Sequence, residues 1–124
     1  MLVETYIRKA NISRVVDGDT LVANIDLGFG IWRNNQKIRV LGVNCPEMHG
    51  PTAEAGHIAR AMTLKWLVQA DSIEADTPDV PVTIQTVVKD TDAFGRVLAK
   101  VQRMDGADLG EYLLANGFAV PFNG

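Results

Sequence analysis

The sequence predicts a β-rich α+β fold in which five strands form a barrel accompanied by two helices. Runs rich in Val, Ile and Thr, which suit strands, occur at residues 6–16, 21–25, 36–43, 82–88 and 96–101. Helical signals follow the third and the fifth of these runs, from residue 52 and from residue 108. No internal repeat or linker interrupts the series. Five short strands with helices inserted at these two places match a Greek-key barrel of the OB type.

The first two runs predict a hairpin that turns at Asp17 and Gly18. Asp-Gly between β-branched segments is a strong hairpin signal because Gly accepts the positive φ that such turns demand. Residues 26–35, with two glycines, are expected to form a longer connection to the third strand. We expect its aromatic residues, Phe29 and Trp32, to cap the barrel mouth, with stacking on nucleic-acid bases as the alternative.

The third run places Lys37 and Arg39 on one face of a strand, and Pro46 closes this strand because proline has no N–H for the ladder. Thr52 is the expected N-cap of the first helix. We expect this helix to bury a stripe of residues at helical spacing, namely Ala55, Ile58, Ala59, Met62 and Trp66.

Two later segments complete the prediction. Residues 71–80 contain several acidic side chains around a proline, and we expect them to form a solvated loop. Asp108 and Glu111 resemble a capping box at the start of the second helix, and Gly117 is a natural C-cap at its end.

At 124 residues the chain is expected to form one domain, residues 1–124, with its own hydrophobic core. The net charge of −3 disfavours a protein that coats nucleic acid through bulk electrostatics, so any phosphate chemistry must depend on a few focused cations. The single cysteine, Cys45, excludes an internal disulfide. The chain begins without signal-peptide features and has no apolar run of membrane-spanning length. We therefore expect a cytoplasmic monomer that does not bind membranes, with secretion after removal of a signal peptide as the alternative.

Four charged residues have side chains that suit phosphodiester hydrolysis. They are Asp19 after the hairpin turn, Arg39 in the third strand, Glu47 after Pro46, and Arg96 after a glycine turn. Arginine forks match phosphate oxygens, a positioned glutamate activates water, and an aspartate is a hard ligand for Ca²⁺. Alone, either arginine would be a charge on a solvated surface. Their order and spacing beside the two carboxylates favour a site instead.

From about residue 6 to residue 122, the chain resembles the staphylococcal (thermo)nuclease family, and these four elements carry the resemblance. The resemblance implies the same OB-type barrel and the hydrolysis of DNA and RNA to 3′-phosphate ends. It implies that Arg39 and Arg96 clamp the phosphate and that Glu47 activates water. It also implies that Asp19 and the backbone carbonyl of Cys45 bind calcium.

The chain departs from the pattern of that family at two positions that matter for activity. A second calcium-ligating aspartate corresponds to Asn44, a neutral amide, so we expect a metal site that binds Ca²⁺ weakly. Phe94 stands where a tyrosine hydroxyl would meet the substrate.

Two classes of function remain. The first is a calcium-dependent, thermonuclease-like phosphodiesterase whose substrate is DNA, RNA or both. The second is a catalytically weak or inactive nuclease-like module that binds nucleic acid or a protein. The presence of Arg39, Glu47 and Arg96 in one chain favours the enzyme. Asn44 and the isoelectric point of 5.2 weigh against it, so the enzyme is the preferred hypothesis and not a conclusion.

Overall fold

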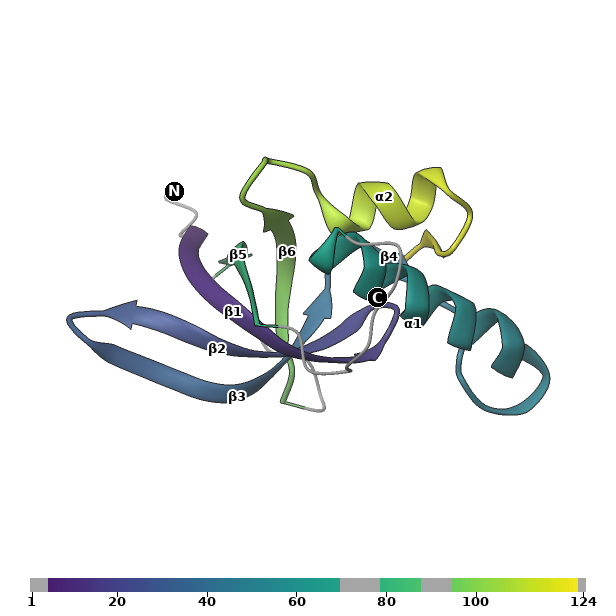
Figure 1. Ribbon diagram of the computed structural model, residues 1–124, viewed down its shortest axis with the longest axis horizontal. Helices are drawn as coiled ribbons and strands as arrows, with labels where there is room; N and C mark the ends of the chain where they lie inside the picture. Colours follow the sequence, from purple (N-terminus) through teal and green to yellow (C-terminus); the bar gives the residue numbers. More distant parts are fainter. Residues whose placement is uncertain (1–4, 70–78, 88–94, 123–124) are drawn as a thin grey trace.

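The computed structural model describes residues 5–69, 79–87 and 95–122 of the chain. Five strands close into one barrel in the order β1, β2, β3, β6, β5 (Figure 1). Their bounds are Thr5–Asp17 for β1, Thr20–Gly28 for β2, Ile31–Val40 for β3, Val80–Val87 for β5 and Val97–Arg103 for β6. Neighbouring strands are antiparallel except β3 and β6, which are parallel. This strand order confirms the predicted OB-type barrel.

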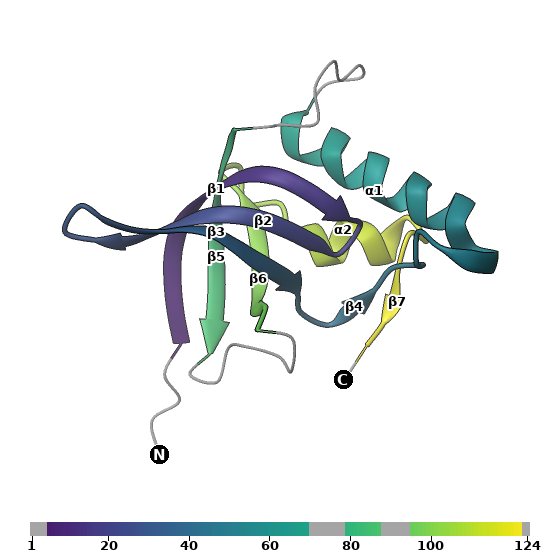
Figure 2. The same ribbon diagram turned by 90° about the horizontal axis from the view of Figure 1, so that it is seen from below.

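Two helices and a small second sheet lie at one end of the barrel (Figure 2). Their bounds are Val43–Asn44 for β4, Gly50–Thr52 for the short 3-10 helix η1, Ala53–Val68 for α1, Leu109–Ala115 for α2 and Val120–Pro121 for β7. Strands β4 and β7 pair with each other. None of the helices in the described parts of the chain is long and apolar enough to cross a bilayer. Most of the expected acidic loop, together with residue 88 and Phe94, lies outside the described residues.

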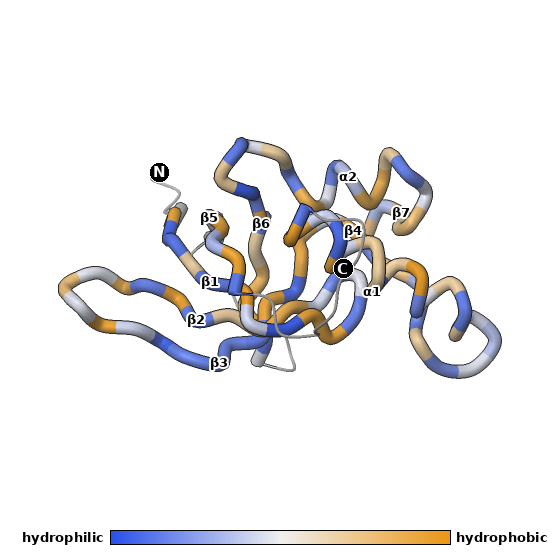
Figure 3. The backbone as a smooth tube through the Cα atoms, viewed as in Figure 1, coloured by the Kyte–Doolittle hydropathy of each residue, from blue (hydrophilic) through white to orange (hydrophobic). Residues whose placement is uncertain are grey.

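The hydrophobic core fills the barrel and continues under both helices. Along β2, Leu21, Ala23 and Ile25 are buried and the residues between them are partly exposed, which is the alternation of a strand with one buried face. The largest fully buried side chains include Ile12, Leu21, Ile38, Leu67, Ile84, Leu109 and Leu113. The helices therefore close one end of the barrel. Figure 3 shows a hydrophilic stretch along the part of β3 that projects from the barrel with β2.

The β2–β3 hairpin corrects the prediction for residues 26–35, because most of this segment is strand and not loop. Only Phe29 and Gly30 separate the two strands. Gly28, Phe29 and Gly30 have φ angles of 85°, 59° and 76°, and this run of left-handed residues makes the tight turn. The expected capping of the barrel mouth is also wrong, because Phe29 is fully exposed at the tip and Trp32 is 46% exposed.

The β1–β2 turn forms where it was predicted, although its glycine is needed for another reason. Asp17 Oδ1 accepts a hydrogen bond from the backbone N–H of Asp19 at 3.1 Å, which stabilises the turn. Gly18 is not among the residues with positive φ. A Cβ atom on Gly18 would lie 2.7 Å from Cys45 Sγ and 2.9 Å from the Ala59 Cβ. Close packing of three chain segments, and not the turn geometry, therefore requires glycine here.

Helix α1 begins near the predicted residue but buries a different face. Ala59 and Trp66 of the expected stripe are buried, whereas Ala55 and Ile58 are exposed and Met62 is only partly buried. The buried residues of the helix are Gly56, Ala59, Thr63, Leu64, Trp66 and Leu67. Toward the N-terminus of the helix the buried residues are small, namely Gly56, Ala59 and Thr63, so a stripe that included Ile58 and Met62 indicated a face that is partly exposed.

The predicted cap of α2 is confirmed. Asp108 is the N-cap, and its Oδ1 accepts a hydrogen bond from the backbone N–H of Glu111 at 3.0 Å. At the other end, Gly117 follows the C-cap residue Asn116 and has a φ of 74°. The second carboxylate oxygen of Asp108 is buried, with Lys100 Nζ at 3.9 Å.

Replacing Asp108 by alanine should lower the free energy of unfolding by about 1 kcal/mol, because an N–H group in the first turn of α2 loses its acceptor. Asp108→Ser keeps a hydroxyl acceptor at the N-cap and should recover most of this loss. Urea denaturation of the wild type and both variants measures the difference. Equal losses in the two variants would show that the cap bond does not stabilise α2.

Candidate active site

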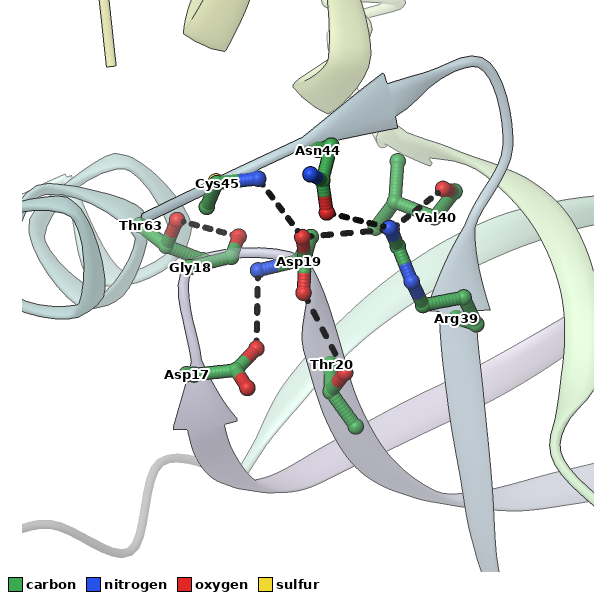
Figure 4. A network of polar contacts seen from close by, with 9 residues as sticks. All are labelled: Asp17, Gly18, Asp19, Thr20, Arg39, Val40, Asn44, Cys45 and Thr63. Carbon is green, nitrogen blue, oxygen red and sulfur yellow. Dashed lines mark hydrogen bonds and ion pairs between the residues drawn. The ribbon is translucent and has the colours of Figure 1, made fainter. Parts of the chain in front are cut away.

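Asp19 is the centre of the candidate site (Figure 4). It lies in the β1–β2 turn and is only 6% exposed. Its Oδ2 accepts a hydrogen bond from the backbone N–H of Cys45 at 2.7 Å and lies 3.3 Å from Arg39 Nη1. Its Oδ1 accepts a longer bond from the Thr20 hydroxyl at 3.3 Å. One carboxylate thus joins the turn to β3 and to the segment that follows β4.

The same carboxylate has an unusual affinity for protons. Removal from water, followed by the neighbouring Asp17 carboxylate, raises the pKa of Asp19 from 3.8 to about 6. The Cys45 N–H and the Arg39 guanidinium act in the opposite direction but do not cancel the shift. Near neutral pH, Asp19 is therefore ionised, but the positive charge around it does not fully offset the cost of burying its negative charge.

Arg39 is held in place at the end of β3 and is only 8% exposed, unlike a charge on a solvated face. Its Nη1 donates to the backbone carbonyl of Val40 at 3.0 Å, and its Nη2 donates to Asn44 Oδ1 at 3.2 Å. The guanidinium carbon lies 5.6 Å from the centre of the Phe122 ring, within the range of a cation–π contact. These contacts, with the Asp19 ion pair, fix the orientation of the guanidinium.

Asn44 and Cys45 reach the site because β3 ends three residues earlier than predicted. It ends at Val40, and a turn through Gly42, with a φ of 80°, leads into β4. Asn44 then presents its amide oxygen to the site and Cys45 its backbone N–H. Burial, followed by the charges of the two nearby aspartates, raises the pKa of the Cys45 thiol to about 12. The thiol therefore stays protonated at neutral pH and is a packing group, not a nucleophile.

Arg96 lies at a cleft that adjoins this network. The cleft has a volume of about 320 Å³ and is lined by Val16, Asp17, Thr20, Lys37 and Arg96. In the parallel ladder Ile38 pairs with Val97, so Lys37 and Arg96 precede paired residues on adjacent strands. Asp17 connects the cleft to the network through its bond to the Asp19 N–H. We call this hollow the Lys37–Arg96 cleft.

Glu47 lies between β4 and α1, and its side chain is exposed. Its backbone carbonyl accepts a hydrogen bond from the Thr52 hydroxyl at 2.9 Å. Thr52 is the N-cap residue of α1, but its side chain makes this bond in place of the predicted capping bond. A Cβ atom on Gly56 would collide with the same carbonyl oxygen. The start of α1 thus fixes the backbone of Glu47 and leaves its carboxylate at the surface.

The structure brings together four of the six residues that the sequence indicates, namely Asp19, Arg39, Asn44 and Cys45. Sequence reasoning did not assign Phe122 to the site. Its position depends on β7, which pairs with β4, and on the bond from the Phe122 N–H to the Gly42 carbonyl at 3.0 Å. No local pattern signals that contact. Lys37 did carry a signal, since it precedes Arg39 by two residues on the same strand face.

The donor atoms available for a metal ion are oxygens of several kinds. Among the described residues, no three His, Cys, Asp or Glu side chains gather as a metal site. The resemblance implies a different set, made of one carboxylate from Asp19, one amide oxygen from Asn44 and the carbonyl of Cys45. Asp19 Oδ2 and Asn44 Oδ1 lie 3.3 and 3.2 Å from nitrogens of the same guanidinium, so both oxygens already face one cation. Hard oxygen donors of this type fit Ca²⁺, although they include only one full negative charge.

Fold and site together define an OB-type barrel that gathers a buried aspartate and several cationic side chains at one end. The family model for staphylococcal nuclease homologues matches residues 37–123, and the chain belongs to this family. The matched stretch contains Arg39, Asn44, Cys45, Glu47 and Arg96, whereas the β1–β2 hairpin with Asp19 precedes it. Comparison with curated proteins gives no match.

The raised pKa of Asp19 predicts how stability depends on pH. The folded state binds the proton more tightly than the unfolded state does, so this contribution to stability is complete below pH 3.8 and is lost as the pH rises through about 6. Its size is at most about 3 kcal/mol. Asp19→Asn has no such proton, so its free energy of unfolding relative to the wild type should increase between pH 4 and pH 7. Urea denaturation across this range tests the prediction, with Asp79→Asn as a control at an exposed residue. If the free energies of unfolding of the wild type and Asp19→Asn change in parallel with pH, the prediction is contradicted.

Proposed function

We propose that the protein is a calcium-dependent nuclease that hydrolyses phosphodiester bonds of DNA, RNA or both. The observation that carries the proposal is the buried Arg39, fixed between Asp19 and Asn44 beside a cleft that contains a second arginine. Membership of the staphylococcal nuclease homologue family supports the same class of chemistry.

Phosphodiester hydrolysis adds negative charge to a phosphate that is already anionic, so the site must supply fixed positive charge. A guanidinium has five N–H donors, and within the described part of the chain Arg39 directs its nitrogens to three oxygen acceptors. The remaining donors suit a phosphate oxygen, and the fixed orientation means that little reorganisation is needed when charge develops. Arg39 is therefore proposed as the first phosphate clamp.

Arg96 is proposed as the second clamp. It shares the Lys37–Arg96 cleft with Lys37, and the cleft adjoins Asp19 through Asp17. A planar guanidinium and an ammonium on adjacent strands suit a phosphate that approaches from solvent. In a chain with a net charge of −3, such local clusters supply the attraction that bulk charge does not.

Glu47 is proposed as the carboxylate that activates the attacking water. General-base catalysis needs a carboxylate that reaches water and is carried by a rigid backbone. The exposed side chain and the backbone held by Thr52 and Gly56 meet both requirements. The base would remove a proton from water while the two arginines stabilise the charge on phosphorus oxygens.

Calcium is proposed to bind through Asp19, Asn44 and the backbone carbonyl of Cys45. When bound, a divalent cation would add positive charge beside the phosphate and help to orient it. A cation there would also offset the deficit of positive charge that raises the pKa of Asp19. A cytoplasmic monomer remains the proposal for location and assembly.

Glu47→Gln should lower the rate of DNA and RNA degradation in Ca²⁺ by about 100-fold or more, because the amide cannot accept the proton from water. The matched control is Glu54→Gln, which removes the same charge from an exposed glutamate in the first turn of α1. Product release from plasmid DNA and from RNA is measured for the wild type and both variants, with chelator as a further control. Equal thermal unfolding of the two variants shows that the fold is retained.

Two outcomes of this assay would count against the proposal. If Glu47→Gln degrades both substrates as fast as the wild type does, the activity resides elsewhere. If the wild type binds nucleic acid but degrades none of it in Ca²⁺, the chain is the non-catalytic module.

Asn44→Asp should tighten Ca²⁺ binding by about tenfold to 100-fold, because it adds a second full negative charge to a ligand set that otherwise has only the Asp19 carboxylate. Asn34→Asp, on the exposed part of the β2–β3 hairpin, adds the same charge elsewhere and should change little. Calorimetric titration of Ca²⁺ into the three proteins, with and without a nucleotide bisphosphate, measures the effect. Weaker or unchanged binding in Asn44→Asp would mean that residue 44 does not contact the metal.

A further inference from the structure

The tip of the β2–β3 hairpin exposes more apolar surface than a turn needs. It carries four exposed hydrophobic side chains, Leu27, Phe29, Ile31 and Trp32, with exposed fractions from 44% upward. We call these residues the apolar tip. Figures 1 and 2 both show the hairpin projecting from the barrel on the side away from α1, so no helix covers it. Exposed apolar clusters of this kind mark binding surfaces.

Phe29 gives the clearest indication within the apolar tip. A phenylalanine with a φ of 59° is in the left-handed region, which bulky side chains rarely adopt. The turn requires a left-handed backbone at this position but not an aromatic side chain, and glycine or asparagine would adopt that conformation more readily. The side chain is nevertheless held entirely in solvent. An uncommon backbone conformation that presents a large ring to solvent suggests a role in binding.

A bulge in β3 places Trp32 on the same face of the hairpin as the proposed phosphate clamps. On β2, Thr20, Val22 and Asp26 point away from the core residues between them, and they pair with Arg39, Lys37 and Trp32 respectively. Thr20 and Arg39 are buried at one end of this outer face, whereas Lys37 and Trp32 are exposed. Residues 32 and 37 are an odd number apart, so a regular strand would put them on opposite faces. The register shift near residue 35 restores the common face.

One hydrogen bond and a tolerated backbone conformation stabilise this arrangement. Asn35 has a φ of 56°, which asparagine tolerates well, and its backbone N–H donates to Asn24 Oδ1 at 3.0 Å. The outer face of the hairpin therefore runs without interruption from Arg39 to Trp32, over about 20 Å at the rise of a β-strand.

Positive charge lies at both ends of this face. The Lys37–Arg96 cleft is at the end near Arg39. At the other end, a second hollow of about 340 Å³ is lined by Arg8, Lys9, Asp26, Leu27, Gly28 and Phe29. Basic side chains next to exposed aromatic rings are the combination that binds single-stranded nucleic acid, with phosphates on the cations and bases on the rings.

We infer that the outer face of the β2–β3 hairpin is an extended subsite for single-stranded nucleic acid. Phe29 and Trp32 stack on bases several nucleotides away from the phosphate held by Arg39 and Arg96, and Lys37 contacts the backbone between them. The length of the face matches about six stacked nucleotides at 3.4 Å each. This inference rests on the proposed nuclease function, because that function supplies the substrate class.

A membrane surface is the other partner that such an apolar tip would suit, since cations next to exposed aromatic residues also bind anionic lipid. A nucleic acid is favoured because the face between the tip and the clamps is mostly polar, with Asn24, Asp26 and Lys37 on it beside a partly exposed Val22. A polynucleotide bound at the tip would also contact this polar face and the two arginines, whereas a lipid surface would contact the tip alone.

The test compares a short and a long oligonucleotide in the presence of chelator, so that binding is measured without calcium-dependent cleavage. Fluorescence anisotropy with labelled dT3 and dT12 is recorded for the wild type and for the double variant Phe29→Leu/Trp32→Leu. Leucine keeps an apolar side chain but removes the aromatic face. The control is Ile58→Ala, which changes an exposed apolar residue on α1. Binding of the same proteins to phosphatidylserine vesicles is measured in parallel.

The inference predicts that the wild type binds dT12 at least about tenfold more tightly than dT3 and that the double variant loses this advantage. The double variant should bind dT3 as tightly as the wild type does, and Ile58→Ala should bind both oligonucleotides as the wild type does. Equal binding of dT3 and dT12 by the wild type, or unchanged dT12 binding by the double variant, would overturn the inference. Vesicle binding with no effect of the double variant on dT12 would assign the tip to a membrane and also overturn it.

Cleavage assays separate this inference from the proposed function. A wild type that binds dT12 through the aromatic rings but cleaves no substrate in Ca²⁺ would refute the nuclease and leave the subsite in place. A wild type that cleaves dT12, with rate and affinity unaffected by the double variant, would refute the subsite and leave the nuclease in place.

Discussion

The burial of the Asp19 carboxylate is the constraint on which the rest of the site depends. A carboxylate removed from water is costly unless positive charge and N–H donors surround it. Here these come from different elements, the guanidinium of Arg39 in β3 and the N–H of Cys45 after β4. The chain must therefore leave the barrel sheet after Val40 and return beside the β1–β2 turn. The path of the backbone and the chemistry of the site are set by one ionised group.

Helix α1 supports this arrangement through its smallest residues. Thr63 donates its hydroxyl to the Gly18 carbonyl at 2.8 Å, and the absence of a side chain on Gly18 and Gly56 lets the helix approach the turn and the Glu47 segment. Large apolar residues farther along, such as Leu67, connect the helix to the core. The helix thus positions the site through Gly56 and Thr63 and packs against the core through residues such as Leu67.

The positions of the five barrel strands and the cap of α2 followed largely from local patterns, because alternation and capping act within a few residues. The barrel type followed from the series of strands and helices and from the family resemblance. The sequence also indicated Asp19, Arg39, Asn44 and Cys45, which lie together. Its errors have two physical origins, namely contacts between distant segments and local turn geometry that the residue pattern did not indicate. The buried face of α1 is decided by how closely it approaches Gly18, and the length of the β2–β3 hairpin by three consecutive left-handed residues. Nothing local to residue 122 indicates that its ring meets Arg39. The catalytic and metal-binding roles stay predictions.

The pairing of β4 with β7 affects when the site is completed during folding. Asn44 pairs with Val120, and Phe122 reaches Arg39, so the site is enclosed only after residues 39–44 have met residues 120–122. Contacts of such large sequence separation form late and slowly, because the intervening chain must first be ordered. During synthesis, a ribosome-bound chain that has already formed the first hairpin still lacks the β7 strand that encloses Arg39. The topology thus delays completion of the site until residues 120–122 have been synthesised and have paired with β4.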